Sequence, residues 1–311
     1  MMKKTISQCM IVKNEEKNIR RALSWGKDIM CEQIVVDTGS SDRTVEIARE
    51  MGAKIFFFPW INDFAAAKNF AIDQAKGDWI AFLDADESFT PEDAAKIPEI
   101  LEYVGDDVDG LLTGIVDLDE NNHITSGGTM IRFFVNRPDL RYVGKIHEHL
   151  VRKGRSGLHL TDATKQLAFL HTGYQEQEKR DKSKFERNLN IILEILKQEP
   201  ENCDYLGYLG DTYSSDGKNE EARDAYKKAV AAMPEKLEVY DQRSSYTYTN
   251  LLRVSQCLNA PEAEVEAIYK EAVEKLPKEP DFDCVMGDWY WRKGQYEKAV
   301  QMYELAIAKL E

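Results

Sequence analysis

The sequence predicts an α/β domain built on a mostly parallel sheet, followed by an all-α domain of helical repeats. Short apolar runs alternate with helical patterns over the first 90 residues, as in a parallel sheet with crossover helices. The run Trp79 to Leu83 is apolar throughout, which is typical of a strand buried on both faces. After residue 184 every pattern is helical and the patterns recur, which predicts the second domain.

Length, charge and cysteine spacing limit the class of protein. The 311 residues suffice for two domains, which we place at 1–178 and 179–311. A net charge of −14 argues against nucleic acid or an anionic membrane surface as the main partner. The chain shows no secretory signal and no transmembrane segment, so we expect a cytoplasmic protein. The five cysteines are scattered and suggest neither a zinc site nor a disulfide framework.

The first domain is expected to begin with four strands joined by helices. The predicted strands are Thr5 to Val12, Gln33 to Asp37, Lys54 to Phe58 and Trp79 to Leu83. The intervening helices are expected to end near Met30, Met51 and Ala75. Asn14 is placed to cap the first of these helices. Right-handed crossovers then make the four strands parallel.

Polar side chains follow three of these strands, within Asn14 to Glu16, Asp37 to Asp42 and Asp84 to Asp86. Parallel sheets bind ligands at the carboxyl ends of their strands, so we expect these segments to converge. The sequence contains neither a P-loop nor a GxGxxG motif. Asp84 and Asp86 suit a divalent cation that carries a nucleotide diphosphate, although a solvated acidic turn is the alternative. The arrangement predicts a nucleotide-sugar site.

Four ordered motifs carry a family resemblance. Cys9 to Glu16, Ile34 to Thr44, Ala67 to Asn69 and Gly77 to Asp86 together resemble family 2 glycosyltransferases of the GT-A fold. The resemblance is strong over about the first 90 residues and looser over the next 85 or so. It implies inverting transfer from a nucleotide-activated sugar with a divalent metal, Mn²⁺ or Mg²⁺.

The resemblance also implies a role for each matched residue. Asp37 would bind the base, usually uracil, Lys68 would lie near the base or diphosphate, and Asp84 would lie near the ribose. Carboxylates accept hydrogen bonds from such N–H and hydroxyl groups. For Lys68 the alternative is a solvated helix lysine. The nucleotide-sugar-binding residues implied in this way are Val12, Asn14, Glu15, Asp37, Lys68, Asp84, Ala85 and Asp86.

Residues 109 to 171 change to short alternating segments, which predict antiparallel strands added to the sheet. An inverting displacement needs a general base within reach of the acceptor's proton. Many family members carry a Glu-Asp pair there, whereas this chain resembles the subset with a His-Glu pair and a trailing His-x-Gly-Tyr. We expect Glu148 to be the base, with His147 or His149 next and a structural hydrogen bond as the alternative.

The metal site is expected to contain Asp86 and His171. The resemblance implies that Asp86 ligates the cation, and the family often supplies a histidine after the last strand. Imidazole is an acceptable ligand for Mn²⁺. The alternative for His171 is a hydrogen-bonded histidine of the core.

The second domain carries the spacing of tetratricopeptide repeats. Small residues at fixed positions let paired helices approach, while tyrosines fill the gaps between them. Such arrays bind peptides or proteins or mediate self-association, so a homodimer through the helical repeats is possible. The first copy is marked by Leu206, Gly210, Tyr213, Ala222, Tyr226, Ala229 and Pro234, and the last by Met286, Gly287, Tyr290, Ala299, Tyr303 and Ala306. Positions expected on the concave face are Asp204, Asp211, Ser214, Asp281, Asp288 and Trp291.

The leading hypothesis is a metal-dependent inverting glycosyltransferase that uses a UDP-sugar. Its acceptor could be a peptide or protein guided by the repeats, as in similar bacteriocin S-glycosyltransferases, or a saccharide. A sugar-1-phosphate nucleotidyltransferase would be expected to show a glycine-rich loop after the first strand, which Met10 to Glu16 lacks. A catalytically silent scaffold is the third reading, and the presence of Asp84 and Asp86 disfavours it.

Overall fold

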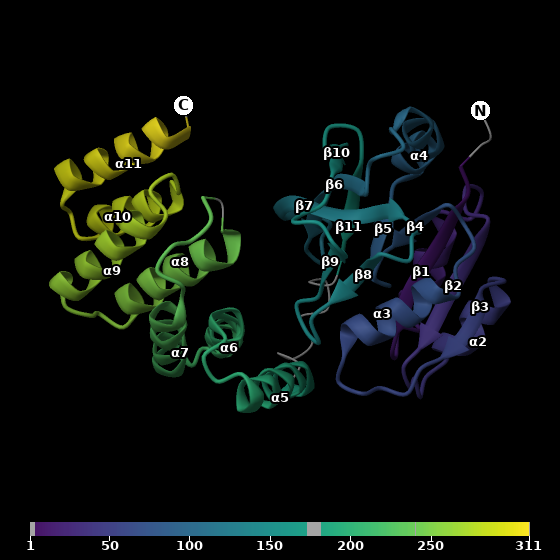
Figure 1. Ribbon diagram of the computed structural model, residues 1–311, viewed down its shortest axis with the longest axis horizontal. Helices are drawn as coiled ribbons and strands as arrows, with labels where there is room; N and C mark the ends of the chain where they lie inside the picture. Colours follow the sequence, from purple (N-terminus) through teal and green to yellow (C-terminus); the bar gives the residue numbers. More distant parts are fainter. Residues whose placement is uncertain (1–3, 173–181, 240, 311) are drawn as a thin grey trace. The chain divides into compact units, whose positions relative to one another are not determined.

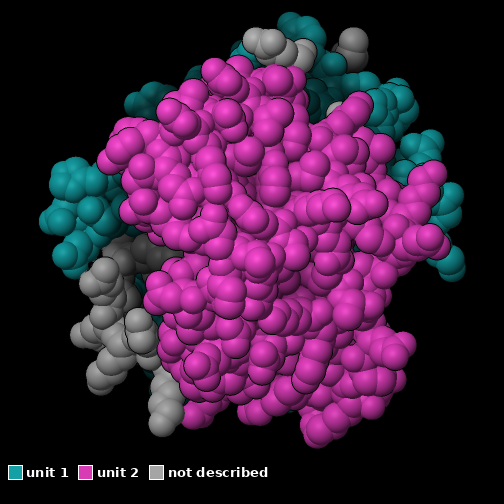
Figure 2. Space-filling view, turned by 90° about the vertical axis from the view of Figure 1, so that its left-hand side faces the viewer, with its two compact units in different colours: residues 1–178 teal, residues 179–311 magenta. Residues whose placement is uncertain are grey.

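The computed structural model describes residues 4–172, 182–239 and 241–310. The chain forms two compact units, Met1–Glu178 and Lys179–Glu311, which Figure 2 colours separately. The boundary predicted between residues 178 and 179 lies among residues 173–181, outside the described part. The predicted motif at His171 to Tyr174 also continues beyond the described residues.

Among the described residues, the first unit contains a nine-stranded mixed sheet (Figure 1). Its first four strands in spatial order are parallel, and β7 runs antiparallel to both β4 and β6. This confirms a mostly parallel sheet with added antiparallel strands. The order is β3 (Lys54–Phe57), β2 (Glu32–Asp37), β1 (Ile6–Val12), β4 (Trp79–Phe82), β7 (Ile124–Val135), β6 (Gly110–Leu118), β11 (Ala168–His171) and β5 (Glu87–Phe89), with β10 (Leu160–Asp162) beside β6.

Strand β4 is buried along its whole length. Trp79 and Ala81 pack in one apolar cluster, whereas Ile80 and Phe82 pack in another. Alternate residues of a strand point to opposite faces, so β4 is covered on both sides. This burial explains why its sequence is uniformly apolar rather than alternating.

Within residues 4–172, the first unit contains four helices: α1 (Ile19–Ser24), α2 (Thr44–Glu50), α3 (Phe64–Asp73) and α4 (Pro91–Tyr103). The expected cap at Asn14 is wrong, because α1 begins only at Ile19 and Asn14 has a positive φ of 58°. The Asn14 side chain instead accepts a hydrogen bond from the Ser41 N–H at 2.8 Å, and its own N–H donates to Ser40 Oγ at 2.9 Å. Asn14 therefore ties the loop after β1 to the loop after β2.

A separate hairpin, β8 (Leu140–Val143) and β9 (His149–Arg152), presents the loop that holds the predicted base. Asn69 on α3 clamps this hairpin, because its amide donates to the Tyr142 carbonyl and accepts from the Tyr142 N–H, both at 2.9 Å. Arg152 donates to the fully buried Asp109 carboxylate at 2.7 Å. These contacts hold the hairpin on the sheet and on α3.

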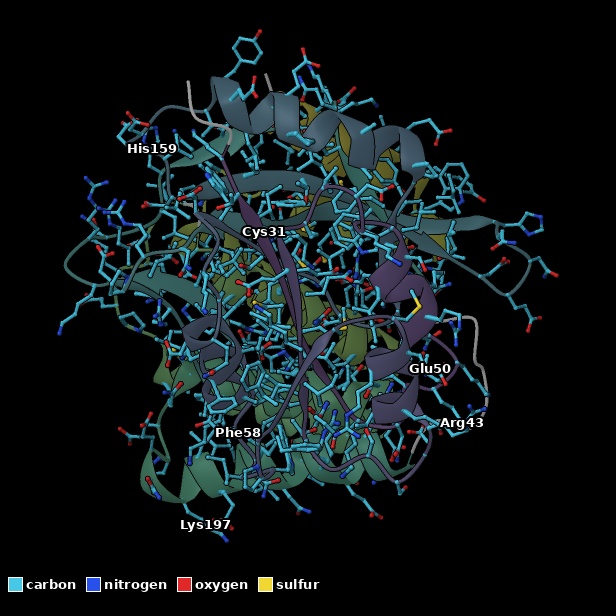
Figure 3. The ribbon with its side chains drawn as sticks, turned by 90° about the vertical axis from the view of Figure 1, so that its right-hand side faces the viewer. Cys31, Arg43, Glu50, Phe58, His159 and Lys197 are labelled. Atoms are coloured by element: carbon cyan, nitrogen blue, oxygen red, sulfur yellow. The ribbon has the colours of Figure 1, made fainter. Side chains whose placement is uncertain are left out.

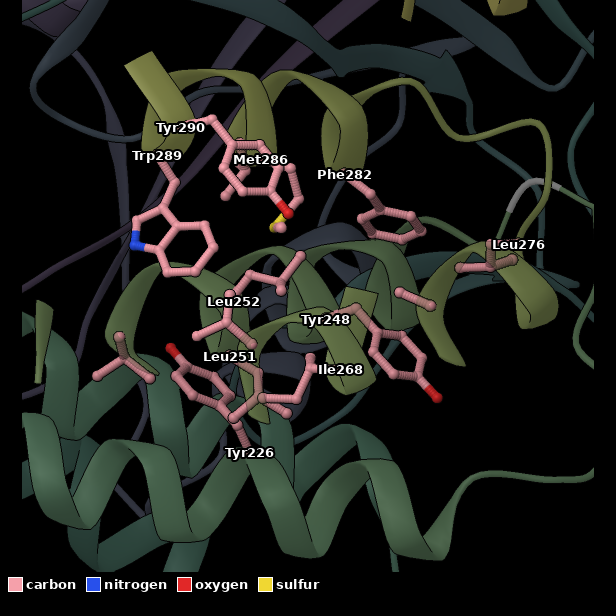
Figure 4. Close-up of a cluster of buried hydrophobic side chains, with 14 of the residues drawn as sticks. Tyr226, Tyr248, Leu251, Leu252, Ile268, Leu276, Phe282, Met286, Trp289 and Tyr290 are labelled. Carbon is pink, nitrogen blue, oxygen red and sulfur yellow. The ribbon is translucent and has the colours of Figure 1, made fainter. Parts of the chain in front are cut away.

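The second unit is all helical in its described part, as predicted, and its core is formed by side chains such as Tyr226, Tyr248 and Phe282 (Figure 4). None of the helices in the described ranges combines the length and apolarity that a membrane crossing requires. The helices are α5 (Lys182–Gln198), α6 (Cys203–Ser215), α7 (Asn219–Ala232), α8 (Gln242–Cys257), α9 (Glu262–Lys275), α10 (Asp281–Arg292) and α11 (Tyr296–Leu310).

The five cysteines are free. Cys9 is buried in β1, whereas Cys31 is exposed just before β2 (Figure 3). Burial raises the pKa of the Cys9 thiol well above its usual range, so Cys9 acts as a small apolar side chain.

Glycine lets paired repeat helices approach at Gly210. A Cβ there would lie 2.4 Å from Cε1 of the buried Tyr226. We expect Gly210→Ala to lower the stability of this unit by about 1–2 kcal/mol, because overpacking outweighs the gain in helix propensity. Thermal unfolding followed by circular dichroism measures this effect. Ser214→Ala, at an exposed position of the same helix, is the control, and equal midpoints for both variants would contradict the packing argument.

Candidate active site

The carboxyl ends of β1 and β2 lie side by side. Val12 pairs with Asp37 across the two parallel strands, and the Thr38 N–H donates to the Val12 carbonyl at 2.9 Å. Asp37 is buried, and its carboxylate accepts hydrogen bonds from the N–H groups of Gly39 and Ser40. The Glu15 N–H donates to Thr44 Oγ1 at 2.7 Å. The structure thus brings Val12, Asn14, Glu15 and Asp37 together.

Asp84 lies between two buried cations. Lys68 Nζ is 3.9 Å from one Asp84 oxygen, and Arg132 Nη2 is 3.5 Å from the other. Lys68 also pairs with Glu148 at 2.7 Å, so the alternative of a solvated lysine is wrong. Burial alone would lower the pKa of Lys68, but Asp84, Tyr142 and Glu148 raise it above its usual value. Lys68 is therefore a permanent positive charge within this cluster.

Arg132, on β7, is a site residue that the sequence interpretation missed. It forms a short ion pair with the buried Glu87, and its guanidinium lies 5.3 Å from the Phe169 ring centre. The signal was an arginine inside the apolar run Met130 to Val135, because a charge buried in a strand needs a specific partner. Arg132 and Lys68 together offset the carboxylates of Asp84, Glu87 and Glu148.

Asp86 meets His171 at the end of β11. His171 Nε2 is 3.4 Å from Asp86 Oδ2, and Nδ1 is 2.8 Å from Asp117 Oδ1. Hydrogen bonding to Asp86 and Asp117 raises the pKa of His171 to about 9, although burial opposes this. Asp117 was not predicted. It holds the ring nitrogen that faces away from Asp86, as the outer partner of a metal-binding histidine does.

The donor set at Asp86 and His171 suits a divalent cation, because Mn²⁺ accepts carboxylate and imidazole ligands. The described residues contain no group of three or more acidic, histidine or cysteine side chains placed to hold a metal. Two protein ligands fit a cation that takes its remaining ligands from water and phosphate oxygens, as Mg²⁺ does at nucleotide sites. The residues present therefore fit the implied metal.

The three candidate bases lie in the loop between β8 and β9 and at the first residue of β9, and their surroundings differ. Glu148 reaches the Lys68 ammonium, and its side chain is only 14% exposed. His147 and His149 are exposed, and His147 has a left-handed backbone with φ of 53°. Ala85, between the two aspartates, is buried in the apolar cluster of β1 and α1. Glu148 is thus the candidate that joins the Lys68 and Asp84 cluster.

The mixed sheet and the charged side chains at its strand ends fit a glycosyltransferase domain. Residues 7–153 match the family described as glycosyl transferase family 2. Residues 205–235 and 285–311 each match a tetratricopeptide repeat. The chain therefore carries a family 2 glycosyltransferase domain followed by tetratricopeptide repeats.

The chain is also similar to individual proteins. The glycosyltransferase SunS of Bacillus subtilis strain 168 is 33% identical over 231 residues, which cover 73% of this chain and 53% of SunS. A tetratricopeptide repeat-containing protein of Synechococcus elongatus is 29% identical over 316 residues, which cover 97% of this chain and 75% of that protein. The chain spans about half the length of SunS. Among solved structures, S. aureus TarS aligns with 85% of this chain and 54% of its own at 14% identity and a TM-score of 0.46.

Proposed function

We propose that this chain transfers a sugar from a UDP-sugar to an acceptor in a metal-dependent, inverting reaction. The observation that carries the proposal is the pairing of Asp86 with His171 beside the cluster of Lys68, Asp84 and Glu148. Asp86, Lys68, Asp84 and Glu148 lie within residues 7–153, which match glycosyl transferase family 2, and His171 follows this range. A cytoplasmic location stays a prediction.

The donor nucleotide is assigned to the ends of β1, β2 and β4. The Asp37 carboxylate accepts from two backbone N–H groups and retains lone pairs that can accept from the N–H of a base. Asp84 can accept from a ribose hydroxyl, while Lys68 and Arg132 stabilise its negative charge. The carboxylates of Asp37 and Asp84 suit the hydrogen-bond donors of a base and a ribose rather than the negatively charged oxygens of a phosphate.

Asp86 and His171 are assigned to the stabilisation of the leaving group. A divalent cation bound there would stabilise the negative charge of the departing diphosphate. Asp117 orients the His171 ring, so that Nε2 faces Asp86. Asp117 would act as a positioning residue in this site.

Glu148 is assigned as the general base that removes the proton of the acceptor. Its ion pair with Lys68 fixes the position of the carboxylate. After Glu148 has accepted the proton, Asp84 remains as a carboxylate partner for Lys68. His147, in the same loop, and His149, at the start of β9, are the alternatives.

The acceptor is proposed to be a peptide or protein, with a saccharide as the alternative. The proposal rests on the fusion of the transferase domain to tetratricopeptide repeats, since such arrays commonly bind polypeptides. A catalytically silent scaffold remains the competing function, and it predicts partner binding without nucleotide binding.

Calorimetric titration with UDP, GDP and dTDP, each with and without Mn²⁺, tests the proposed function. We expect binding that requires the metal and favours UDP. The Asp37 carboxylate would accept from the imide N–H of uracil, and the pair of Asp86 and His171 accounts for the metal requirement. If no nucleotide binds under any condition, the result favours a catalytically silent scaffold. The next experiment would then identify the partner that the repeats bind.

We also propose a homodimer through α11. Its outer face exposes Ile307 by 58% and Leu310 by 75%, whereas the equivalent Val230 and Met233 of the first repeat pack on the core. Ile307→Glu is expected to convert a dimer into a monomer in light scattering, and Gln301→Glu on the same helix is the control. A wild-type protein that is monomeric at every concentration would contradict this proposal.

A further inference from the structure

Tyr142, on β8, carries a hydroxyl that the mechanism does not use. Its side chain is 94% buried, and its ring packs edge-on against Phe82 and Phe134 with centres 5.5 and 5.9 Å away. Lys68 Nζ lies 5.1 Å from the centre of the Tyr142 ring. Within the described residues, the Tyr142 hydroxyl has no hydrogen-bond partner. A buried polar group without a partner destabilises a fold, so its presence needs a reason.

A second buried donor in the same cluster is unpartnered. Arg132 Nε has no acceptor in the part of the chain that the structure describes, although the outer nitrogen of this guanidinium binds Glu87. Tyr142 and Arg132 each shift the pKa of the other electrostatically. Lys68, Asp84 and Glu148 also act electrostatically on the pKa of Tyr142. Two donors without acceptors therefore lie among the charged side chains of the candidate active site.

Both groups are donors at neutral pH. Burial raises the pKa of Tyr142 to about 12, so its hydroxyl keeps its proton. The guanidinium of Arg132 stays charged, because Glu87 and Asp84 raise its pKa further although burial opposes them. Arginine has no acceptor atom. The group that satisfies these two donors must supply acceptor oxygens.

We propose that the Tyr142 hydroxyl and Arg132 Nε recognise hydroxyl oxygens of the sugar ring that is transferred. This inference rests on the proposed function and specifies the sugar subsite of the same site. A sugar hydroxyl both donates and accepts hydrogen bonds, so one ring can donate to the Asp84 and Glu148 carboxylates while it accepts from Tyr142 and Arg132.

The position of the cluster also fits a sugar. Asp84 is assigned to the nucleotide side and Glu148 to the acceptor side, and the transferred ring must lie between the two. The Asp84 side chain is 42% exposed. Asp84 and Glu148 are the neighbouring carboxylates that contact Lys68, and side-chain rotation on ligand binding is common. Tyr142 is therefore assigned to donor specificity rather than to nucleotide binding.

Tyr142→Phe tests the inference by removing a single oxygen atom. The affinities of UDP and of UDP-glucose, UDP-galactose and UDP-N-acetylglucosamine are measured calorimetrically with Mn²⁺. For the UDP-sugar that wild type binds most tightly, we expect the variant to lose about tenfold in affinity. Its affinity for UDP should change by less than about twofold, because UDP lacks the sugar ring. Tyr103→Phe, on the exposed end of α4, is the matched control and should leave both affinities unchanged.

The outcomes separate this inference from the proposed function. If wild type binds UDP but Tyr142→Phe binds the UDP-sugar as wild type does, the hydroxyl serves only a buried water and the inference falls. Equal losses for UDP and the UDP-sugar would also overturn it, because the hydroxyl would then support the nucleotide site or the fold. A wild-type protein that binds no nucleotide would remove both the proposed function and the sugar subsite. Arg132→Lys, which keeps the charge but removes Nε, should reproduce the selective loss.

Discussion

Asp86→Ala is expected to weaken metal-dependent UDP binding by about 100-fold or more, because it removes one of the two proposed protein ligands of the cation. His171 would remain but would lose its contact with the Asp86 carboxylate. Calorimetric titration with UDP in the presence of Mn²⁺ measures the loss. Asp106→Ala, at an exposed position of the same unit, is the matched control. Tight UDP binding by Asp86→Ala without metal would exclude the assignment.

The pH dependence of the same titration gives an independent check. The pKa of His171 is raised to about 9, so the ring carries a proton at pH 7 that a cation must displace. The apparent affinity for Mg²⁺ in the presence of UDP is therefore expected to rise from pH 7 to pH 9 and to level off above that. His171→Ala should remove this dependence. A flat profile for the wild-type protein would place the cation away from His171.

Glu148→Gln is expected to leave UDP affinity within a few fold of wild type and to lower the rate of transfer by about 10² to 10⁴. The amide has the shape of the carboxylate but cannot accept the acceptor's proton. Lys68 keeps Asp84 as a partner, so the nucleotide side should remain intact. Transfer is measured as sugar incorporation into an acceptor found by screening candidate peptides with UDP-sugars.

Two further variants make the Glu148 result specific. His147→Gln and His149→Gln alter the other two candidate bases of the same hairpin and should retain most of the transfer rate. If Glu148→Gln remains active while one histidine variant is inactive, that histidine is the base. Glu148 would then be a structural partner of Lys68.

Local patterns predicted the elements well where burial is continuous. The run Trp79 to Leu83 is apolar because β4 is covered on both faces, and the structure places β4 between β1 and β7. The same reasoning wrongly predicted that Asn14 caps the first helix, because asparagine is a common capping residue. Its side chain bonds to the loop after β2, which is close only because β1 and β2 are adjacent.

In the helical repeats, too, one prediction from the sequence succeeded and another failed. Gly210 and Tyr226 were recognised from their spacing, and the structure shows that they pack directly. Asp211 was expected on an open concave face. It instead accepts hydrogen bonds from Tyr226 at 2.8 Å, Arg243 at 2.7 Å and Asn250 at 3.0 Å, so its carboxylate is engaged within the array.

The sequence by itself determined the order of the two units, the parallel character of the first sheet and the motifs of a family 2 glycosyltransferase. These follow from periodicity and short motifs, which are properties of neighbouring residues. Only the tertiary structure decided which charged side chains form ion pairs. Lys68 pairs with Glu148, Arg132 with Glu87, and His171 with Asp86 and Asp117. Such pairs join residues far apart in the chain, and their cost of burial is offset only when the fold brings the partners together.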